Sequence, residues 1–436
     1  MTAQTPSSPL LGLYRLIAAA LGPFAALYLR ARARDGKEDP ARLQERFGHG
    51  GEARPDGALV WLHGASVGES GVALQIAEAM GARDPALSFL ITTGTLTSAQ
   101  RVARRPPPRT RHAFAPIDRV DAVRRFLSHW RPNLGVFVES EIWPNLILES
   151  QAAGVPLALV NARMSPRSLG RWARWPNAAR RLNSAFTIAL AADKRTADAL
   201  GRLRGESGLA IGNLKLAVEP PRVDVAQRAA LEAEIRTRPV WLAASTHEGE
   251  EEIALAAHAA LRAARPDALL IIAPRHPDRG ARIAELAGGA PRRAHGDAID
   301  SAPVYVADTI GELGLFYAIA PVALIAGSLK SELKGHNPAE AAHMGCAIVT
   351  GPHVESFDDL YAALFAADAA LRVRDAGELA AAIAACWSGD IARRRQIAAA
   401  SQVVEGGAGA LEETVRRLTA LLPAKAPQSR VIDAGA

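Results

Sequence analysis

The stretch Leu134-Gly135-Val136-Phe137-Val138-Glu139-Ser140-Glu141-Ile142-Trp143-Pro144-Asn145 contains the pattern that decides the fold. Its apolar first half predicts a strand that is buried on both faces, as in parallel sheets. Pro144 favours the first turn of a following helix. Two carboxylates, Glu139 and Glu141, stand between the two elements, where the apolar strand ends. We expect one carboxylate to face a cleft and the other to hold a structural partner, because buried carboxylates need partners.

The same order of apolar strand, polar loop and helix recurs along the whole chain. Such alternation predicts doubly wound α/β domains, in which ligands bind beside the carboxyl ends of the strands. The strands predicted for the first half are 58–62, 87–92, 112–115, 134–138, 156–160 and 187–191. Those predicted for the second half are 240–243, 269–272, 304–306, 322–325 and 347–349.

The segment 217–225 contains two consecutive prolines, which predicts a linker between two domains. We expect these domains at 36–216 and 226–423. Residues 391–422 are expected to be helical, and the tail at 424–436 is expected to be disordered. Two such domains would place a crevice between the carboxyl ends of both sheets.

The composition excludes several classes of protein. With 49% hydrophobic and 22% charged residues among 436, the chain has enough apolar surface for a large core, and disorder is not expected. The net charge of +6 is modest and no basic-aromatic platform occurs, which disfavours nucleic-acid binding. The 11 histidines show no metal-binding spacing, so no dedicated metal site is expected. Two cysteines without a CxxC pattern suit a reducing compartment.

Residues 1–35 are predicted to associate with a membrane. The apolar run at 10–29 is interrupted by Arg15 and Pro23, and a basic stretch at 30–37 follows it. This order of charge is opposite to that of a signal peptide. We expect an interfacial anchor on the cytoplasmic face, with the basic residues on anionic headgroups. A single uncleaved span and a helix packed on the domain are the alternatives.

Late in the chain, the segment 335–342 combines helix-start signals with a carboxylate. Asn337 is a good N-cap, and Pro338 suits the first helical position. The backbone N–H groups at such a helix start, including that of Ala339, attract anions. Glu340 would repel a lone phosphate but could accept hydrogen bonds from ribose hydroxyls, which favours a nucleotide. An ordinary capped helix is the alternative interpretation.

Five polar loops lie at successive strand ends of the second half, which favours a bound nucleotide. The five loops are 245–250, 274–277, 308–313, 327–328 and 335–342. Arg275, in the loop at 274–277, is placed for phosphate recognition, because its planar guanidinium group matches the geometry of phosphate oxygens.

In the first half, the glycine-bearing loop at 63–70 lacks the GK[ST] sequence of a phosphate loop. Glu69 there is either a general base facing a crevice or a helix-start carboxylate stabilised by the helix dipole. Lys215, in Gly-Asn-Leu-Lys at 212–215, could reach across the cleft to a phosphate or be a solvated surface side chain.

Taken together, these motifs resemble the Kdo (3-deoxy-D-manno-octulosonic acid) transferases of lipopolysaccharide synthesis, from about Leu13 to past Phe357. The matching motifs are HGASVGE at 63–69, TTGTLTS at 92–98, ESEIWPN at 139–145, NARMSPRS at 161–168, GNLK at 212–215, ASTHEGEEE at 244–252, PRHPDR at 274–279, DTIGELG at 308–314, GHNPAEAA at 335–342 and GPH at 351–353.

The resemblance implies an inverting, metal-independent glycosyltransferase of GT-B architecture at the cytoplasmic face of the inner membrane. Its implied donor is CMP-Kdo, its acceptor is a lipid A precursor of the lipid IVA type, and no further cofactor is implied. By motif, Glu69 matches the catalytic base, while Glu139 and Lys215 match positions that stabilise the transition state. The positions that match CMP-binding residues are Pro274, Arg275, Ile310, Gly311, Glu312, Asn337, Pro338 and Glu340, with the backbone of Ala339 between the last two.

The chain departs from the family pattern at four positions. Gly64 and Ala65 vary the loop before Ser-Val-Gly-Glu. Ile310 replaces the usual Met before Gly-Glu-Leu, which a backbone contact would tolerate, and Lys334 stands where the family commonly has a glycine.

Overall fold

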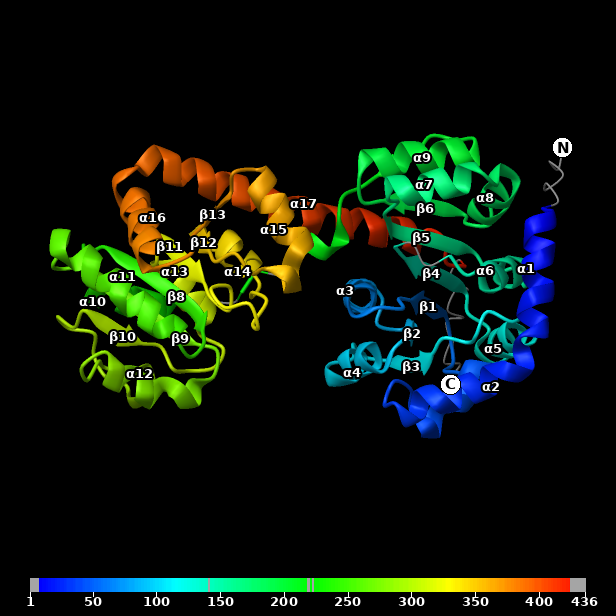
Figure 1. The fold of residues 1–436 in the computed structure, drawn as a ribbon, viewed down its shortest axis with the longest axis horizontal. Helices are drawn as coiled ribbons and strands as arrows, with labels where there is room; N and C mark the ends of the chain where they lie inside the picture. The colour runs from blue at the N-terminus through cyan, green and yellow to red at the C-terminus, as the bar shows by residue number, and fades with distance from the viewer. Residues whose placement is uncertain (1–7, 140–141, 218–219, 222, 424–436) are drawn as a thin grey trace, which may run out of the picture. The chain divides into compact units, whose positions relative to one another are not determined.

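The computed structural model describes residues 8–139, 142–217, 220–221 and 223–423 (Figure 1). Two compact units make up this part of the chain. The first contains residues up to Leu214 together with those from Gly409 onward, and the second is Lys215–Ala408. Glu141, residues 218–219 and 222 of the predicted linker, and the predicted tail at 424–436 lie outside the described residues.

The first unit is built on a seven-stranded sheet in the order β3-β2-β1-β4-β5-β6-β7, with parallel pairing throughout. The order reverses between β1 and β4, where Val60 pairs with Leu134 and His63 with Phe137. Ligands bind at such switch points in open α/β sheets. The strands are β1 (Leu59–His63), β2 (Ser88–Thr93), β3 (Thr110–Phe114), β4 (Leu134–Val138), β5 (Leu157–Ala162), β6 (Ile188–Ala191) and β7 (Leu209–Ala210).

Helices cover both faces of this sheet, as the continuous apolar strands predicted. Alternate residues of β1 enter different cores: Leu59 and Trp61 pack with α5, α6, α8 and α9, whereas Val60 and Leu62 pack with α3 and α4. These helices, with α7, are α3 (Val67–Arg83), α4 (Leu96–Arg104), α5 (Val120–Trp130), α6 (Pro144–Ala152), α7 (Pro166–Ala173), α8 (Pro176–Asn183) and α9 (Lys194–Arg204).

The second unit repeats the plan with a six-stranded parallel sheet in the order β10-β9-β8-β11-β12-β13. Its order reverses between β8 and β11, which places the loops after these strands at the second switch point. The strands are β8 (Val240–Thr246), β9 (Leu269–Pro274), β10 (Val304–Val306), β11 (Val322–Ile325), β12 (Ala347–Thr350) and β13 (Ala370–Arg372).

The faces of the second sheet are covered by two sets of helices. One core includes residues of α10, α13, α14 and α15, and the other includes residues of α11, α12 and α16. The bounds are α10 (Val225–Ile235), α11 (Glu250–Ala264), α12 (Gly280–Leu286), α13 (Leu313–Ile319), α14 (Ala339–His343), α15 (Asp358–Ala366) and α16 (Ala376–Ser388). Short 3₁₀ turns occur at η1 (Pro40–Phe47), η2 (Leu214–Leu216), η3 (Pro277–Arg279), η4 (Arg293–His295) and η5 (Glu355–Phe357).

The predicted fold class, two doubly wound Rossmann-like domains of the kind that make up GT-B proteins, is confirmed. All eleven predicted strands are present, each within two or three residues of its predicted ends. The sequence prediction missed β7 and β13, because these short strands are mostly exposed and form no apolar run, unlike the equally short but fully buried β10.

The last helix, α17 (Asp390–Thr419), contributes to the cores of both units. Ala400 and Val404 belong to a core of the second unit, whereas Val415 and Leu418 pack with β1 and β4 of the first. The predicted second domain, 226–423, therefore extends too far, because the apolar face of the end of α17 is buried by the first unit.

The N-terminal pair α1 (Pro9–Ala20) and α2 (Gly22–Arg34) packs on the first unit by one side. Leu11 and Leu29 are buried, and the Tyr14 hydroxyl donates to Asp118 Oδ2 at 2.7 Å. Large apolar side chains on the same helices stay exposed: Leu13, Leu16, Ile17, Leu21, Phe24, Leu27 and Tyr28.

In the described part of the chain, no single helix is long and apolar enough to cross a membrane. The pair α1 and α2, bent by 67°, reaches that length and composition only when both helices are counted together.

Candidate functional site

Glu69 lies in the first turn of α3, directly after β1 at the switch point of the first sheet. Ser66 Oγ accepts a hydrogen bond from the Glu69 N–H at 3.3 Å, and Glu69 Oε2 accepts from the Ser66 N–H at 3.1 Å. This reciprocal capping box fixes the carboxylate at the start of the helix. Glu69 is only 8% exposed. Glu69 is therefore a helix-start carboxylate, as one of the two interpretations expected. The same residue also lies just beyond the carboxyl end of β1.

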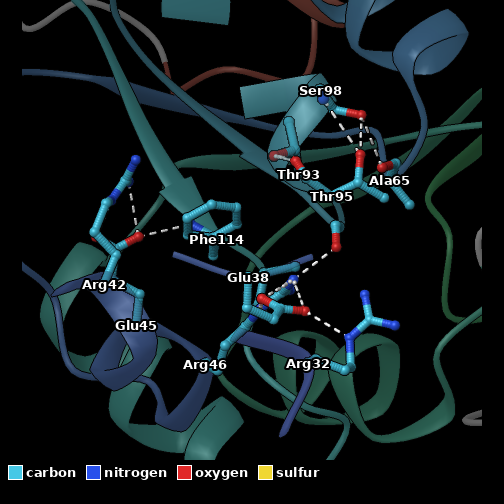
Figure 2. A network of polar contacts seen from close by, with 12 residues as sticks. Arg32, Glu38, Arg42, Glu45, Arg46, Ala65, Thr93, Thr95, Ser98 and Phe114 are labelled. Atoms are coloured by element: carbon cyan, nitrogen blue, oxygen red, sulfur yellow. Dashed lines mark hydrogen bonds and ion pairs between the residues drawn. The ribbon is translucent and has the colours of Figure 1, made fainter. Parts of the chain in front are cut away.

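The loop that carries Glu69 is braced by the neighbouring strand end, as Figure 2 shows. The Ala65 carbonyl accepts hydrogen bonds from the Gly94 N–H at 3.1 Å and from Ser98 Oγ at 3.2 Å. Arg46 in turn donates to the Gly94 carbonyl at 2.6 Å and to the Ala115 carbonyl at 3.0 Å. One guanidinium thus ties the ends of β2 and β3 to the loop before α3.

Arg46 is itself held by Glu38 in the segment that follows α2. Both Glu38 oxygens accept from Arg46, and Arg32 of α2 donates to Glu38 Oε1 at 3.1 Å (Figure 2). Burial lowers the pKa of the Arg46 guanidinium, and the Glu38 carboxylate opposes that shift. A charge this deeply buried needs such pairing. The N-terminal helices are therefore linked by hydrogen bonds to the loop that positions Glu69.

Glu139 follows β4 in a left-handed backbone conformation, with φ of 63°. Asn161 at the end of β5 donates from Nδ2 to Glu139 Oε1 at 3.4 Å. The Oδ1 atom of Asn161 accepts from the Leu214 N–H at 2.9 Å. Asn161 is fully buried and also has a positive φ, 51°. One amide side chain thus holds Glu139 and the residue before Lys215, a role that the sequence signalled only through a polar residue in an apolar strand.

Lys215 is ion-paired. Its Nζ atom lies 3.2 Å from Asp359 Oδ2 of α15, and both side chains are 27% exposed. Lys215 is therefore a partly exposed side chain held by the carboxylate of Asp359, and neither of the two interpretations of its role is decided by this contact.

A cavity of about 540 Å³ lies beside Glu139 in the first unit. Its wall combines aromatic and aliphatic side chains with three guanidinium groups, a mixture that suits an anionic amphiphile. The lining includes Leu10, Glu139, Ile142, Arg163, Met164, Arg171, Trp172, Arg174 and Trp175.

In the second unit, a cavity of about 360 Å³ opens at the carboxyl ends of β8 and β9 and after β10. Four of the predicted nucleotide-binding residues line it together: Pro274, Arg275, Ile310 and Gly311. The remainder of its wall includes Ser245, Ala273, His276, Pro277, Ala307, Thr309, Leu313 and Phe316.

Glu312 differs from Pro274, Arg275, Ile310 and Gly311, because it does not line the cavity. Its side chain instead orders the loop after β10. Arg293 donates to both of its oxygens, at 3.1 and 2.7 Å, and Thr309 Oγ1 also bonds to it. The hydrogen bonds from Arg293 lower the pKa of the Glu312 carboxyl, so the pair is ionised at neutral pH.

The predicted helix start at 335–342 is displaced by one residue. Helix α14 begins at Ala339 with Pro338 in the cap position, and Asn337 Oδ1 accepts from the Ala339 N–H at 3.0 Å. The expectation that backbone N–H groups of residues 337–339 take a phosphate stays a prediction, and the structure bears on two of these three residues. Pro338 has no N–H and the N–H of Ala339 already has a partner, because the asparagine closes a turn on its own backbone.

Glu340, in the first turn of α14, is half-buried. Burial raises the pKa of its carboxyl, and the positive charge of Arg275 opposes the shift. The structure thus places Glu340 within the electrostatic reach of a residue that lines the nucleotide-sized cavity.

Among the residues described, no group of three or more His, Cys, Asp or Glu side chains is arranged to hold a metal ion.

Comparisons with known proteins agree with this geometry. Residues 41–218 match the family model of the 3-deoxy-D-manno-octulosonic acid transferase (Kdo transferase). The chain is 35% identical over 374 residues to a probable mitochondrial 3-deoxy-D-manno-octulosonic acid transferase of Arabidopsis thaliana, covering 81% of this chain and 82% of the relative. It is also 35% identical over 383 residues to the 3-deoxy-D-manno-octulosonic acid transferase of Bordetella pertussis, covering 84% and 88%.

Among solved structures, the C-terminal CMP-Kdo binding domain of WaaA from Acinetobacter baumannii is 30% identical, with 41% of this chain and 97% of that domain covered and a TM-score of 0.40. The identity to full-length relatives over more than four-fifths of both chains is decisive. The chain belongs to the 3-deoxy-D-manno-octulosonic acid (Kdo) transferase family.

Proposed function

We propose that this glycosyltransferase moves Kdo from CMP-Kdo to a lipid A precursor of the lipid IVA type, with inversion at the anomeric carbon. The observation that carries the proposal is the cavity in the second unit, where Pro274, Arg275, Ile310 and Gly311 meet. Its position beyond the carboxyl ends of parallel strands is the usual place for a nucleotide.

Glu69 is the proposed general base. It removes the proton of the acceptor hydroxyl, whose oxygen attacks the anomeric carbon from the face opposite the departing CMP. Its position at the end of β1 supports this role. The capping box holds the carboxylate in one place, and preorganisation of this kind lowers the cost of reaching the transition state.

The departing CMP gains a negative charge that protein cations must balance. We assign this role to Arg275 and Lys215, with Glu139 as a further group at the reaction centre. Lys215 would exchange the carboxylate of Asp359 for the developing charge. In the proposal no further cofactor takes part, because the leaving group carries its own phosphate and these two cations meet it.

The cavity beside Glu139 is the proposed site of the acceptor. Lipid A precursors are phosphorylated and acylated, and the wall offers Arg163, Arg171 and Arg174 to phosphate and Trp172 and Trp175 to acyl chains. The acceptor's membrane also explains the exposed apolar side chains of α1 and α2. Basic residues at 30–37 follow them, and anionic headgroups attract such stretches. We therefore place the enzyme at the cytoplasmic face of the inner membrane.

A reconstituted reaction tests the proposal. Purified enzyme is incubated with CMP-Kdo generated in situ and a tetra-acylated lipid A precursor, and products are identified by mass spectrometry. A mass gain of one or more Kdo residues is expected with wild type and not with Glu69→Gln. The anomeric configuration of the product, read by NMR, tests inversion.

Donor identity is tested separately by thermal shift with CMP and with UDP. Stabilisation by CMP alone is expected. A shift with UDP and none with CMP would overturn the proposed donor, even if some sugar transfer were seen.

A further inference from the structure

Three histidines from separate loops form one cluster next to the cavity of the second unit. His247 Nε2 lies 2.8 Å from His336 Nε2, and the two rings are stacked at 5.1 Å between centroids with an interplanar angle of 23°. His276, which lines the cavity, approaches His247 edge-on at 5.7 Å. The loops after β8 and β9 and the segment before α14 supply these rings.

The loop of His247 is held in place by a buried carboxylate. Glu250, fully buried at the start of α11, accepts from the His247 N–H at 3.2 Å and from the Gly327 N–H at 2.8 Å. It also accepts from the N–H groups of Ser328 and Leu329, each at 3.1 Å. The start of α11 is thereby tied to the end of β11.

The ring of His336 is fixed by close packing. A Cβ at Gly327 would lie 2.6 Å from His336 Cδ2, and the Tyr361 hydroxyl donates to the His336 carbonyl at 3.0 Å. The ring of His336 thus packs directly against the backbone at Gly327, and the hydrogen bond from Tyr361 holds the segment that carries it.

A hydrogen bond between two imidazole nitrogens needs one N–H donor and one lone pair, so at least one ring of the pair is neutral. Burial, followed by the nearby charges of His247, Arg275 and His276, lowers the pKa of His336 to about 4. Burial also lowers the pKa of His247, against the opposing charges of Glu250 and Glu251. Both rings are thus neutral at pH 7 while the cavity holds no anion.

The charged surroundings of the pair are mixed, so an added anion would change its protonation. The groups that act on it are Glu250 and Glu251 from α11 and Arg275 and His276 from the loop after β9, and Glu340 of α14 interacts in turn with Arg275. Arg275 is the permanent cation of this group, and the histidines are the groups that can gain a charge near neutral pH.

We propose that the His247–His336 pair is a proton-coupled binding site for the phosphate of the nucleotide donor. The arriving anion breaks the Nε2···Nε2 hydrogen bond, and one imidazole takes a proton from solvent and donates it as a hydrogen bond to a phosphate oxygen. No bond of the nucleotide breaks in this binding step. The inference rests on the proposed function, because it takes the cavity to be a nucleotide site.

Calorimetry with a phosphodiester tests the proton uptake. Cytidine 5′-(methyl phosphate) keeps a single negative charge at all pH values of interest, so any proton taken up on binding goes to the protein. Titrations of the full-length enzyme in HEPES and in Tris at pH 7.5 should differ in enthalpy by an amount equal to the uptake of roughly one proton. Cytidine, which lacks the phosphate, should give no difference between buffers.

The affinity should also depend on pH in a defined direction. Binding raises the pKa of one histidine, so the affinity for the diester is highest below the pKa of the free pair and falls by about tenfold per pH unit between that pKa and the raised pKa of the complex. Above the raised pKa the affinity should become independent of pH, because no proton is then taken up.

Variants identify the responsible side chains. His336→Asn and His247→Asn should each bind the diester about ten- to a hundredfold more weakly, the range for a hydrogen bond to a charged group, and should lose the proton uptake. Their affinity for cytidine should stay unchanged, which also shows that they fold. His295→Asn is the matched control, because His295 is an exposed imidazole of the same unit in η4.

Three results would count against the inference. Diester binding by wild type without proton uptake, or uptake that persists in both variants, would overturn it and leave the nucleotide site standing. If neither cytidine nor cytidine 5′-(methyl phosphate) bound at all, both the proposed nucleotide donor and the proposed role of the histidine pair would be refuted.

Discussion

At the scale of single residues, the structure gives several predicted side chains two tasks. Glu69 caps α3 and stands at the end of β1, so the helix-start interpretation and the general-base interpretation are compatible. Glu139 and Asn161 both adopt positive φ at neighbouring strand ends, and non-glycine residues held this way tend to mark functional sites. Such strain persists only where the surroundings determine it, here through the amide of Asn161.

Glu69→Gln should lower the rate of Kdo transfer by about 10²- to 10⁴-fold, the usual contribution of a general base. Glutamine can still close a capping box, so the thermal unfolding midpoint should change little. Single-turnover rates and cytidine nucleotide affinity are the measurements. A rate close to wild type would show that Glu69 acts only as a cap.

Lys334→Gly should raise the free energy of unfolding by up to about 1 kcal/mol. Lys334 has φ of 60°, a left-handed backbone conformation that disfavours a side chain and that glycine adopts without strain. The neighbouring Gly335→Ala provides the contrast. Its φ is 81° and a Cβ would lie 2.8 Å from the His353 carbonyl oxygen, so stability should fall. Equal effects of the two changes in denaturant titrations would contradict this account of the loop.

At the scale of elements, strand ends and helix starts carry nearly every group discussed. The ends of β1, β4 and β5 position Glu69, Glu139 and Asn161, and the ends of β8 and β9 line the nucleotide-sized cavity. Parallel strands run into the same edge of a sheet, so residues far apart in sequence meet there. Helices α1 and α2 add a different element, one side of which is packed while the other exposes apolar side chains.

The end of β1 should make the first unit acid-sensitive. Burial lowers the pKa of His63 to about 4, whereas an unfolded histidine titrates near 6.5. The unfolded chain therefore binds more protons below pH 6.5, and stability falls as pH drops from there toward 4. The loss from His63 alone should reach about 2 kcal/mol at pH 5. Denaturant titrations at pH 7 and pH 5 measure it, and a His63→Asn variant with an unchanged pH dependence would refute the assignment.

The exposed side of α1 and α2 should bind membranes. Substituting Leu16, Phe24 and Leu27 with glutamate should weaken sedimentation with anionic vesicles by tenfold or more, because apolar burial is lost and like charge is added. Activity on a short-chain soluble acceptor should change much less. Val225→Glu with Ile391→Glu is the matched control, since both are exposed apolar residues of the second unit. Undiminished vesicle binding by the triple variant would exclude this face as the anchor.

At the scale of the whole molecule, two units with separate cores share one helix. Each sheet has its own helices on both faces, whereas α17 gives residues to both cores. The two units also divide the proposed chemistry, because the residues around Glu69 and Glu139 belong to the first and the nucleotide-sized cavity belongs to the second.

Leu418→Ala should destabilise the first unit by about 2–5 kcal/mol and leave CMP affinity intact, because this end of α17 is buried against β1 and β4. Leu379→Ala in α16 removes the same group from a core of the second unit. It should weaken CMP binding at temperatures where that unit begins to unfold. Calorimetric unfolding with and without CMP distinguishes the two, and identical profiles would mean that the units do not unfold separately.

The sequence by itself determined the two doubly wound units, because long apolar strands and strand-loop-helix order are local patterns that a parallel sheet requires. It also indicated Pro274, Arg275, Ile310 and Gly311, which follow strand ends and match family motifs, and the structure brings them to one cavity. Only the tertiary structure decided the partners of Glu139 and Lys215, the turn that occupies the N–H of Ala339, and the pairing of His247 with His336. These contacts join segments as far apart in the sequence as Lys215 and Asp359, or depend on a local turn, and neither is encoded in a local pattern.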